Sequence, residues 1–293
     1  MTKLNNHTKL MNLMIALSQK NPNFPYPLFQ VGYALETILP YFSESGGALI
    51  NPDLQFKSEG DNNLIFIECK SGNLEHQQAL NFKKVKKDDI IEKGVTSLDV
   101  SSLNFEFIYF CSSNNKDVLI KADNLYNYNF PILCFNEDKI ELIKNDIKGE
   151  KLKSLFPIFI NNKYIPTEYY PYGPDDKKEY ISLSIFQSLL HIMNDNEEFN
   201  VEMIIKDNHK LYDFIDSKGK TKLKEVVGKI LSDLEQNELK DMLRRLRNQP
   251  KFRIINPKSY KKFRDICQNL IKEYKEDIDQ LPLSEFGEVI SSK

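Results

Sequence analysis

Three charged residues near the start of the chain have the types and spacing of a hydrolytic metal site. Asp53 follows Pro52, and Glu68 and Lys70 lie fifteen and seventeen positions further on, at the end of an apolar run. Because side chains alternate along a strand, Glu68 and Lys70 would share one face, and buried charges are costly unless they are paired or bind something. Two carboxylates can hold a hard cation such as Mg²⁺, and a nearby ammonium can stabilise charge on a phosphate. This pattern predicts phosphodiester hydrolysis.

Two predicted strands and the turn between them must position these side chains. Residues 47–56 and 63–72 are mostly apolar, and the polar stretch 57–62 carries a Gly-Asp turn signal, which together predict a hairpin. Pro52 would break regular pairing in the first segment, so that segment can be bent into two strands. The hairpin would bring Asp53 to the same end as the acidic and basic residues of the second strand.

The Pro52-Asp53 pair followed by Glu68-Cys69-Lys70 resembles the motif of the PD-(D/E)XK nuclease superfamily. The resemblance covers roughly the first half of the chain and implies an α/β fold with a restriction-endonuclease-like αβ core, a mixed sheet flanked by helices. It also implies that Asp53 and Glu68 ligate Mg²⁺, with Mn²⁺ as an alternative, while Lys70 stabilises charge or orients the water. The alternative interpretation is a surface hairpin with a chance Glu-x-Lys pair.

A helix is predicted before the hairpin, because apolar residues recur at helical spacing over residues 28–42. In many restriction-like nucleases such a helix supplies a further acidic residue to the metal site. Glu36 is the residue here that would do so. The alternative is an ordinary exposed glutamate on a helix.

A second helix is predicted after the hairpin, from the turn at residues 71–73 to about residue 92. Gln78 falls on its apolar stripe, four residues after Leu74 and four before Phe82. A buried amide needs a partner, and several branches of the superfamily place a glutamine beneath the metal site. Gln78 resembles that residue; the alternative is a partly exposed amide at the helix edge.

The remaining elements of the first half complete a regular order. With the hairpin they predict helix, strand, strand, strand, helix and strand, provided that a further short strand precedes Pro52. The additional elements are expected at residues 10–17 (helix), 105–111 (strand), 117–125 (helix), 131–135 (strand) and 140–143 (edge strand).

The chain is expected to contain two domains joined by a linker. Residues 146–178 are rich in proline and tyrosine, which predicts an ordered linker. The nuclease domain would then span residues 1–145. A mainly helical, nucleic-acid-binding domain would span residues 179–293.

The last domain is predicted to be compatible with a winged helix, with a short strand at residues 251–255. Its helices are expected near residues 181–192, 223–234, 239–246 and 263–274. A basic cluster spans the third of these helices and the segment after it, and it is a candidate phosphate-contact surface. Its members are Arg244, Arg245, Arg247, Lys251, Arg253, Lys258, Lys261 and Lys262, and the predicted nucleic-acid contacts among them are Arg244, Arg245, Arg247, Lys251 and Lys258. The alternative is a solvated face or a protein interface.

Composition describes a soluble protein without a general affinity for nucleic acid. The 293 residues are 41% hydrophobic and 28% charged, with a net charge of −2, so any DNA-binding surface must be local. No apolar run approaches membrane-spanning length and no signal peptide opens the chain, so no membrane partner is expected. The four cysteines lack metal-ligand spacing. Buried reduced thiols in a cytoplasmic protein are therefore expected.

The sequence as a whole favours a Mg²⁺-dependent endonuclease that hydrolyses DNA phosphodiester bonds, in restriction or anti-phage defence. No glycine-lysine phosphate loop indicates an ATP motor. By resemblance, the partners would be a DNA substrate, a second copy in a homodimer and other proteins of a defence system. The alternatives are an RNA-cutting effector gated by a partner or ligand, and a non-catalytic nucleic-acid-binding assembly subunit.

Overall fold

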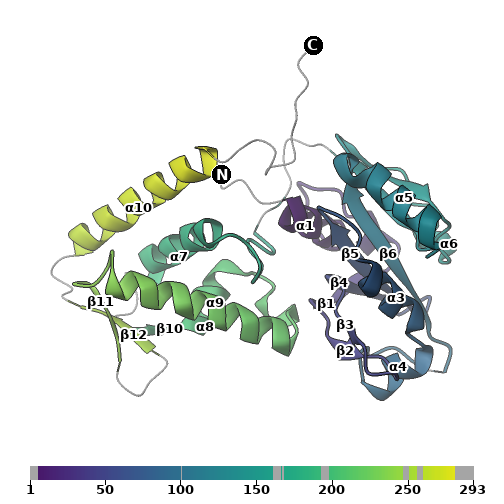
Figure 1. The fold of residues 1–293 in the computed structure, drawn as a ribbon, viewed down its shortest axis with the longest axis horizontal. Helices are drawn as coiled ribbons and strands as arrows, with labels where there is room; N and C mark the ends of the chain where they lie inside the picture. The colour runs from purple at the N-terminus through teal and green to yellow at the C-terminus, as the bar shows by residue number, and fades with distance from the viewer. Residues whose placement is uncertain are drawn as a thin grey trace, which may run out of the picture. The chain divides into compact units, whose positions relative to one another are not determined.

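The computed structural model describes residues 6–99, 101–160, 166, 168–192, 198–246, 251–255 and 260–280. Contacts divide the chain into two compact units, whose helices and strands are labelled in Figure 1. The sheet unit comprises residues 9–167 with 213–216. The helical unit comprises residues 1–8, 168–212 and 217–293.

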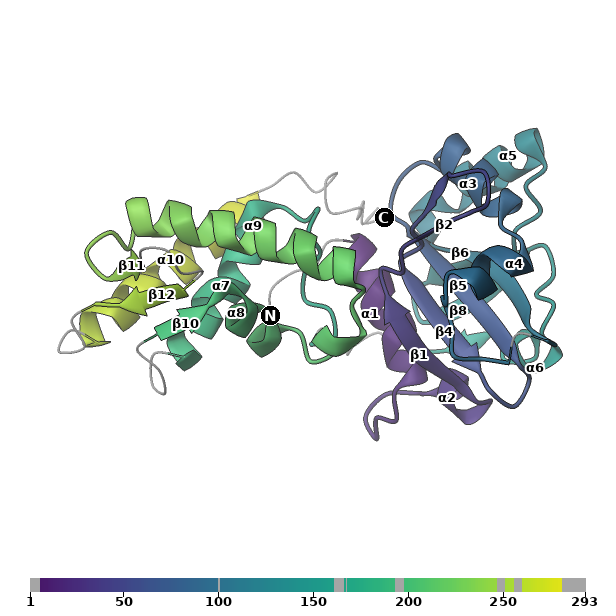
Figure 2. The ribbon, with the colours of Figure 1, turned by 90° about the horizontal axis from the view of Figure 1, so that it is seen from below.

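The sheet unit is built on a mixed seven-stranded sheet. Its strand order is β1-β4-β5-β6-β7-β8-β9, and Figure 2 shows β1, β4, β5 and β6 side by side. The β5/β6 and β6/β7 pairs are parallel, whereas the other neighbouring pairs are antiparallel. The strands are β1 (Tyr33–Ile38), β4 (Leu54–Ser58), β5 (Asn63–Lys70), β6 (Asn104–Ser112), β7 (Ile132–Asn136), β8 (Lys139–Lys144) and β9 (Ile158–Phe159). The expected mixed sheet flanked by helices is thus confirmed.

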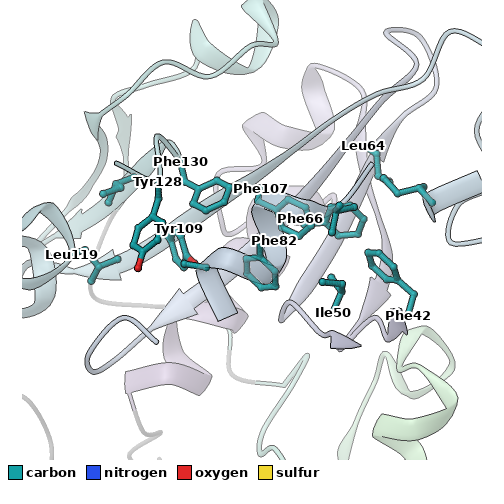
Figure 3. Packing of buried hydrophobic residues seen from close by; sticks show 14 of the residues in the cluster. Phe42, Ile50, Leu64, Phe66, Phe82, Phe107, Tyr109, Leu119, Tyr128 and Phe130 are labelled. Carbon is teal, nitrogen blue, oxygen red and sulfur yellow. The ribbon is translucent and has the colours of Figure 1, made fainter. Parts of the chain in front are cut away.

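Aromatic packing fills one face of this sheet beneath two short helices, α3 (His76–Lys84) and α4 (Lys87–Glu92). The Phe107 ring stacks on Phe66 at 4.7 Å and on Phe82 at 4.6 Å between centroids (Figure 3). All eight residues of β5 are buried, which explains its nearly continuous apolar sequence. Two charged side chains at the end of this strand therefore lie in a largely apolar setting.

The helix expected over residues 28–42 is wrong. The segment forms one helical turn, α2 (Pro27–Gln30), and then enters β1 after Gly32, whose φ is +89°. A β-bulge between Leu35 and Thr37 shifts the register with β4, so that Leu35 and Ile38 are both buried. The bulge produces an apolar spacing of three residues, which is indistinguishable from helical spacing in the sequence.

The first segment of the expected hairpin is divided into two strands at Pro52, as its sequence allowed. Strand β3 (Leu49–Ile50) pairs with β2 (Phe42–Ser43) in a separate two-stranded sheet, while β4 joins the main sheet. The helix expected to begin near residue 71 starts only at α3. It is interrupted before α4, where Asp89 accepts a hydrogen bond from the backbone N–H of Lys86 at 2.7 Å.

The remaining elements of the sheet unit follow the predicted order, but the sheet extends into the expected linker. The described elements include α1 (Asn6–Ser18), the 3-10 turn η1 (Ser113–Asn115), α5 (Lys116–Tyr126) and α6 (Glu150–Lys153). Both α6 and β9 lie inside residues 146–178, and β9 pairs with β8. The first part of the expected linker therefore belongs to the sheet unit, and the side chains of Ile158 and Ile160 are buried.

The helical unit combines helices with a small antiparallel sheet of order β10-β12-β11. Helix α7 packs against α8, α9 and α10. The elements are α7 (Lys178–Ile192), β10 (Glu198–Asn200), α8 (Val201–Asn208), η2 (Tyr212–Phe214), α9 (Ser217–Gln236), β11 (Leu243–Arg245), β12 (Lys251–Ile254) and α10 (Tyr260–Gln280). The mainly helical C-terminal part is thus confirmed.

The helix expected over residues 239–246 is wrong. Helix α9 ends at Gln236, and the following turn leads into β11, in which Leu243 pairs with Ile254. The apolar residues of this segment are buried from a turn and a strand rather than from one helix face: Leu239 and Met242 lie in the turn. The spacing of apolar residues alone could not distinguish a helix from this turn and strand.

Candidate active site

The end of the β4–β5 hairpin brings Asp53 and Glu68 to the same place. Leu54 pairs with Ile67 in this antiparallel hairpin. One residue further toward its open end, Asp53 therefore lies opposite Glu68. The backbone N–H of Asp53 donates to the carbonyl of Ile67 at 3.1 Å. The Asp53 carboxylate in turn accepts a hydrogen bond from the backbone N–H of Cys69 at 2.7 Å. These two bonds fix the first carboxylate across the end of the central strand.

Glu68, Lys70 and Gln78 form a closed cluster of three contacts. The Lys70 ammonium lies 2.8 Å from Glu68 Oε1 and donates to Gln78 Oε1 at 2.6 Å. The Gln78 amide donates from Nε2 to Glu68 Oε1 at 3.0 Å. Gln78 therefore holds both charged groups, since its oxygen accepts from the ammonium while its nitrogen donates to the carboxylate.

The charged side chains of this cluster are buried, and so is Asp53. Because a buried charge without a partner is costly, each of these charges needs one. Asp53, Glu68 and Lys70 are 7%, 6% and 8% exposed. Removing one partner of a buried ion pair typically costs about 3–5 kcal/mol, because the other charge is left uncompensated.

Neighbouring groups support the cluster without joining it. The Asn115 amide donates to the carbonyl of Lys70 at 3.2 Å, which ties the end of β5 to η1. Cys69 points to the other face of the strand, and burial, followed by the charges of Asp53 and Glu68, raises the pKa of its thiol well above the ordinary value. Cys69 is therefore a protonated thiol and contributes only its backbone N–H.

Glu36 lies on β1 at the bulge, so its expected place on a helix is wrong. Its carboxylate accepts hydrogen bonds from Thr96 Oγ1 at 2.9 Å, the Ser97 backbone N–H at 3.0 Å and Gln55 Nε2 at 2.7 Å. Lys57 approaches it at 3.8 Å. Within the described residues, none of these contacts reaches Asp53 or the closed cluster. Glu36 therefore holds the segment that follows α4 against β1.

The donor set at the hairpin end fits a hard cation. Carboxylate oxygens are the ligands that Mg²⁺ prefers, and Mg²⁺ is commonly held by one or two carboxylates, with water and phosphate completing its shell. Asp53 and Glu68 supply such a pair. Across the described ranges, no group of three or more His, Cys, Asp or Glu side chains is arranged to hold a metal.

Three of the predicted basic residues of the helical unit lie on a β-hairpin, so the helix expected for Arg244 and Arg245 is wrong. Arg244 and Arg245 are exposed on β11, and Lys251 is exposed on β12. Arg253 is adjacent to them and forms an ion pair with Glu198 on β10. The other two predicted basic contacts, Arg247 and Lys258, lie outside the described residues.

Sequence reasoning missed a second basic element beside this hairpin. Lys218, Lys222 and Lys229 are exposed on α9. A groove of about 600 Å³ is lined by α9, the start of α8 and the hairpin, and it includes Arg245 and Phe252. In the sequence, the lysines at every second position from 218 to 224 could have indicated this basic element.

Comparison with known proteins places the chain in a family. Residues 6–170 match the model of the MJECL32 domain, and the chain belongs to that family. Residues 174–286 match a domain of unknown function, DUF8601. The two matched ranges correspond closely to the sheet unit and the helical unit.

A similar curated protein is the uncharacterized protein MJECL32 of Methanocaldococcus jannaschii. The two are 26% identical over 183 residues, which covers 55% of this chain and 40% of the relative. The chain therefore spans less than half the length of that relative. No solved structure matches significantly. Among the described residues, none of the helices has the length and apolar character to span a membrane.

Proposed function

We propose that this protein is a Mg²⁺-dependent endonuclease that hydrolyses DNA phosphodiester bonds. The observation that carries the proposal is the buried contact of Glu68 with Lys70 and Gln78 at the end of the strand facing Asp53. A carboxylate pair with an adjacent ammonium is suited to a reaction in which negative charge develops on a phosphate.

The order of elements supports this assignment. Helix α1, strands β1, β4 and β5, the α3–α4 pair and strand β6 follow each other in the chain, and β5 pairs in parallel with β6. This order is consistent with a restriction-endonuclease-like core, in which β1 would be the further strand expected before Pro52. Asp53 precedes β4 and Glu68 lies near the end of β5, where the superfamily motif would place them.

Each side chain has a separate role in the proposed reaction. Asp53 and Glu68 would hold Mg²⁺, with Mn²⁺ as an alternative, and the ion would polarise the phosphodiester and activate water. Lys70 would stabilise the negative charge on the phosphate through its ammonium. Gln78 positions that ammonium and the Glu68 carboxylate through its two hydrogen bonds. The Cys69 backbone N–H holds Asp53 in place.

The helical unit would bind the DNA. A helix, a strand, two further helices and a β-hairpin, with sheet order β10-β12-β11, have the order of a winged helix. In such a module, α9 would face a DNA groove and the hairpin would contact the backbone. The exposed Arg244, Arg245 and Lys251 on the hairpin supply positive charge for phosphates. The recognition helix proposed here is therefore α9, not residues 239–246.

The biological setting is proposed from the superfamily resemblance. Restriction or anti-phage defence is consistent with a nuclease unit joined to a DNA-binding unit. Two copies would bring two sites to the two strands, and partner proteins of a defence system would direct the activity.

Cleavage of supercoiled plasmid in the presence of Mg²⁺ or of a chelator tests the proposed function. We expect Mg²⁺-dependent nicking or cutting, and we expect Lys70→Met to lower the rate by about a hundredfold to a thousandfold because it removes a stabilising charge. The methionine keeps the apolar stem of the lysine, and circular dichroism checks that the variant is folded. Lys93→Met, which removes an exposed lysine, is the matched control.

The two variants separate the proposed role from a general loss of positive charge. Equal rates for Lys70→Met and the parent protein would remove Lys70 from the reaction. Equal losses in Lys70→Met and Lys93→Met would indicate a nonspecific charge effect and would contradict the site.

A further inference from the structure

An exposed aromatic surface lies beside the first turn of α3. His76 and Tyr126 pack with ring centroids 4.3 Å apart, and Tyr126 is 47% exposed. His76 belongs to α3, whereas Tyr126 is the last residue of α5. We call the His76 and Tyr126 rings the aromatic platform.

The platform is held in place from beneath by a buried tyrosine. Tyr128 is 2% exposed, and its hydroxyl forms a hydrogen bond with His76 Nδ1. Its ring lies 5.5 Å from that of Tyr126. Figure 3 shows Tyr128 near Tyr109 and Phe130, which belong to the core of the sheet unit. The exposed rings are therefore pre-organised by core packing rather than left free to reorient.

Positive charge lies against the backbone that joins Tyr126 to Tyr128. The Lys83 ammonium donates to the carbonyl of Asn127 at 2.9 Å, between the two tyrosines in the chain. Lys83 and Lys84 are both exposed in the last turn of α3. An aromatic surface with an adjacent ammonium matches the chemistry of a nucleotide, because the rings can stack on a base while the cation contacts a phosphate.

Helix α3 connects the platform to the candidate active site. Gln78, which contacts Glu68 and Lys70, lies two residues after His76. Side chains two positions apart on a helix diverge by about 200°, so one side of the first turn faces the buried charges and the other faces the platform. A strand crossing this turn would reach both within about one helix diameter, roughly 10 Å.

We propose that the aromatic platform stacks on an unpaired base of the DNA strand that enters the active site, while Lys83 contacts its phosphate. The inference rests on the proposed function for the identity of the ligand. It adds a substrate preference: DNA with an unpaired nucleotide close to the scissile phosphate binds better than fully paired DNA. Stacking is tolerant of base identity, so this preference concerns structure rather than sequence.

Binding of single-stranded DNA that carries the fluorescent base 2-aminopurine tests the platform directly. The full chain with Glu68→Gln is used, so that binding is measured without cleavage. We expect quenching of 2-aminopurine on binding, because a stacked fluorescent base is quenched. Tyr126→Ala is expected to remove the quenching and to weaken binding by roughly 5- to 150-fold, the range for losing one base–aromatic stack.

Two matched variants distinguish stacking from loss of structure. Tyr126→Phe keeps the ring and is expected to retain the quenching. Leu125→Ala removes the neighbouring side chain, which is 72% exposed, and is expected to bind within about twofold of the parent. Unchanged quenching and affinity in Tyr126→Ala would overturn the inference.

The inference and the proposed function fail in different ways. If the protein with Glu68 intact cleaves DNA but Tyr126→Ala binds normally, the endonuclease proposal is supported and the platform proposal is contradicted. If the platform quenches 2-aminopurine but the protein with Glu68 intact cleaves no DNA, the platform is supported as a binding site and the endonuclease proposal is contradicted.

Discussion

At the scale of single residues, the candidate site depends on a neutral amide placed between two opposite charges. Gln78 accepts from Lys70 and donates to Glu68, so its two ends complement the two charges. A carboxylate at this position would repel Glu68, and an apolar residue would leave both groups with fewer partners. The amide is therefore chemically specific at this position.

Replacing this amide should slow the reaction without removing a metal ligand. We expect Gln78→Ala to lower the cleavage rate by about 10- to 100-fold, as is typical when a group that orients a metal-site residue is lost. Gln77→Ala is the matched control, because Gln77 is exposed and its amide bonds to Asn81 on the same helix. Steady-state kinetics on a labelled duplex would measure both.

The effect on kcat distinguishes positioning from substrate binding. A fall in kcat with little change in KM supports the positioning role of Gln78. A normal rate in Gln78→Ala, or the same loss in Gln77→Ala, would contradict it.

Part of this site could be predicted from the sequence because it depends on local periodicity. Strand alternation put Glu68 and Lys70 on one face, and helical spacing put Gln78 on the inner side of α3. Asn115, which supports the end of β5, and Thr96, which holds Glu36, come from segments distant from their partners in the sequence. Nothing local in the sequence indicates such contacts, because they depend on how separate elements pack.

At the scale of elements, the same apolar spacing can arise from more than one structure. The bulge in β1 buries Leu35 and Ile38 from a strand, and the turn before β11 buries Leu239 and Met242. Both segments have helical spacing without forming helices. The central strand β5 and the long helix α9 were predictable, because each has a sustained pattern that fits one period.

The hairpin of the helical unit leads to a prediction about salt dependence. We expect the double variant Arg244→Ala/Arg245→Ala to bind duplex DNA more weakly. Its slope of log affinity against log salt should be smaller by about 1.8, since each lost phosphate contact removes about 0.9. Fluorescence anisotropy over a salt series, with Glu68→Gln present to prevent cleavage, would measure this slope.

A second basic surface of the same unit provides the control. Arg264 and Lys272 are exposed on α10, and the double variant Arg264→Ala/Lys272→Ala removes the same amount of charge. An equal change of slope in both double variants would assign the effect to net charge and not to the hairpin. An unchanged slope in Arg244→Ala/Arg245→Ala would remove the hairpin from the DNA-binding surface.

At the scale of the whole molecule, the proposed tasks are divided between two units. The buried charges and the aromatic platform lie in residues 9–167, and the basic hairpin and α9 lie in the other unit. With a net charge of −2, the proposed attraction to DNA would have to come from local surfaces. The family match over residues 6–170 and the separate match over residues 174–286 follow the same division.

The central claim is that Asp53 and Glu68 together bind a divalent cation. It can be tested by replacing Mg²⁺ with Fe²⁺ and adding ascorbate and peroxide, so that hydroxyl radicals cut the polypeptide next to the bound ion. The fragments, mapped by mass spectrometry, report the position of the ion in the full chain whether or not DNA is cleaved.

We predict backbone cuts beside Asp53 and beside Glu68, suppressed by excess Mg²⁺ and lost in Glu68→Gln. Cuts that fall elsewhere, or the same cuts in Glu68→Gln, would contradict the account.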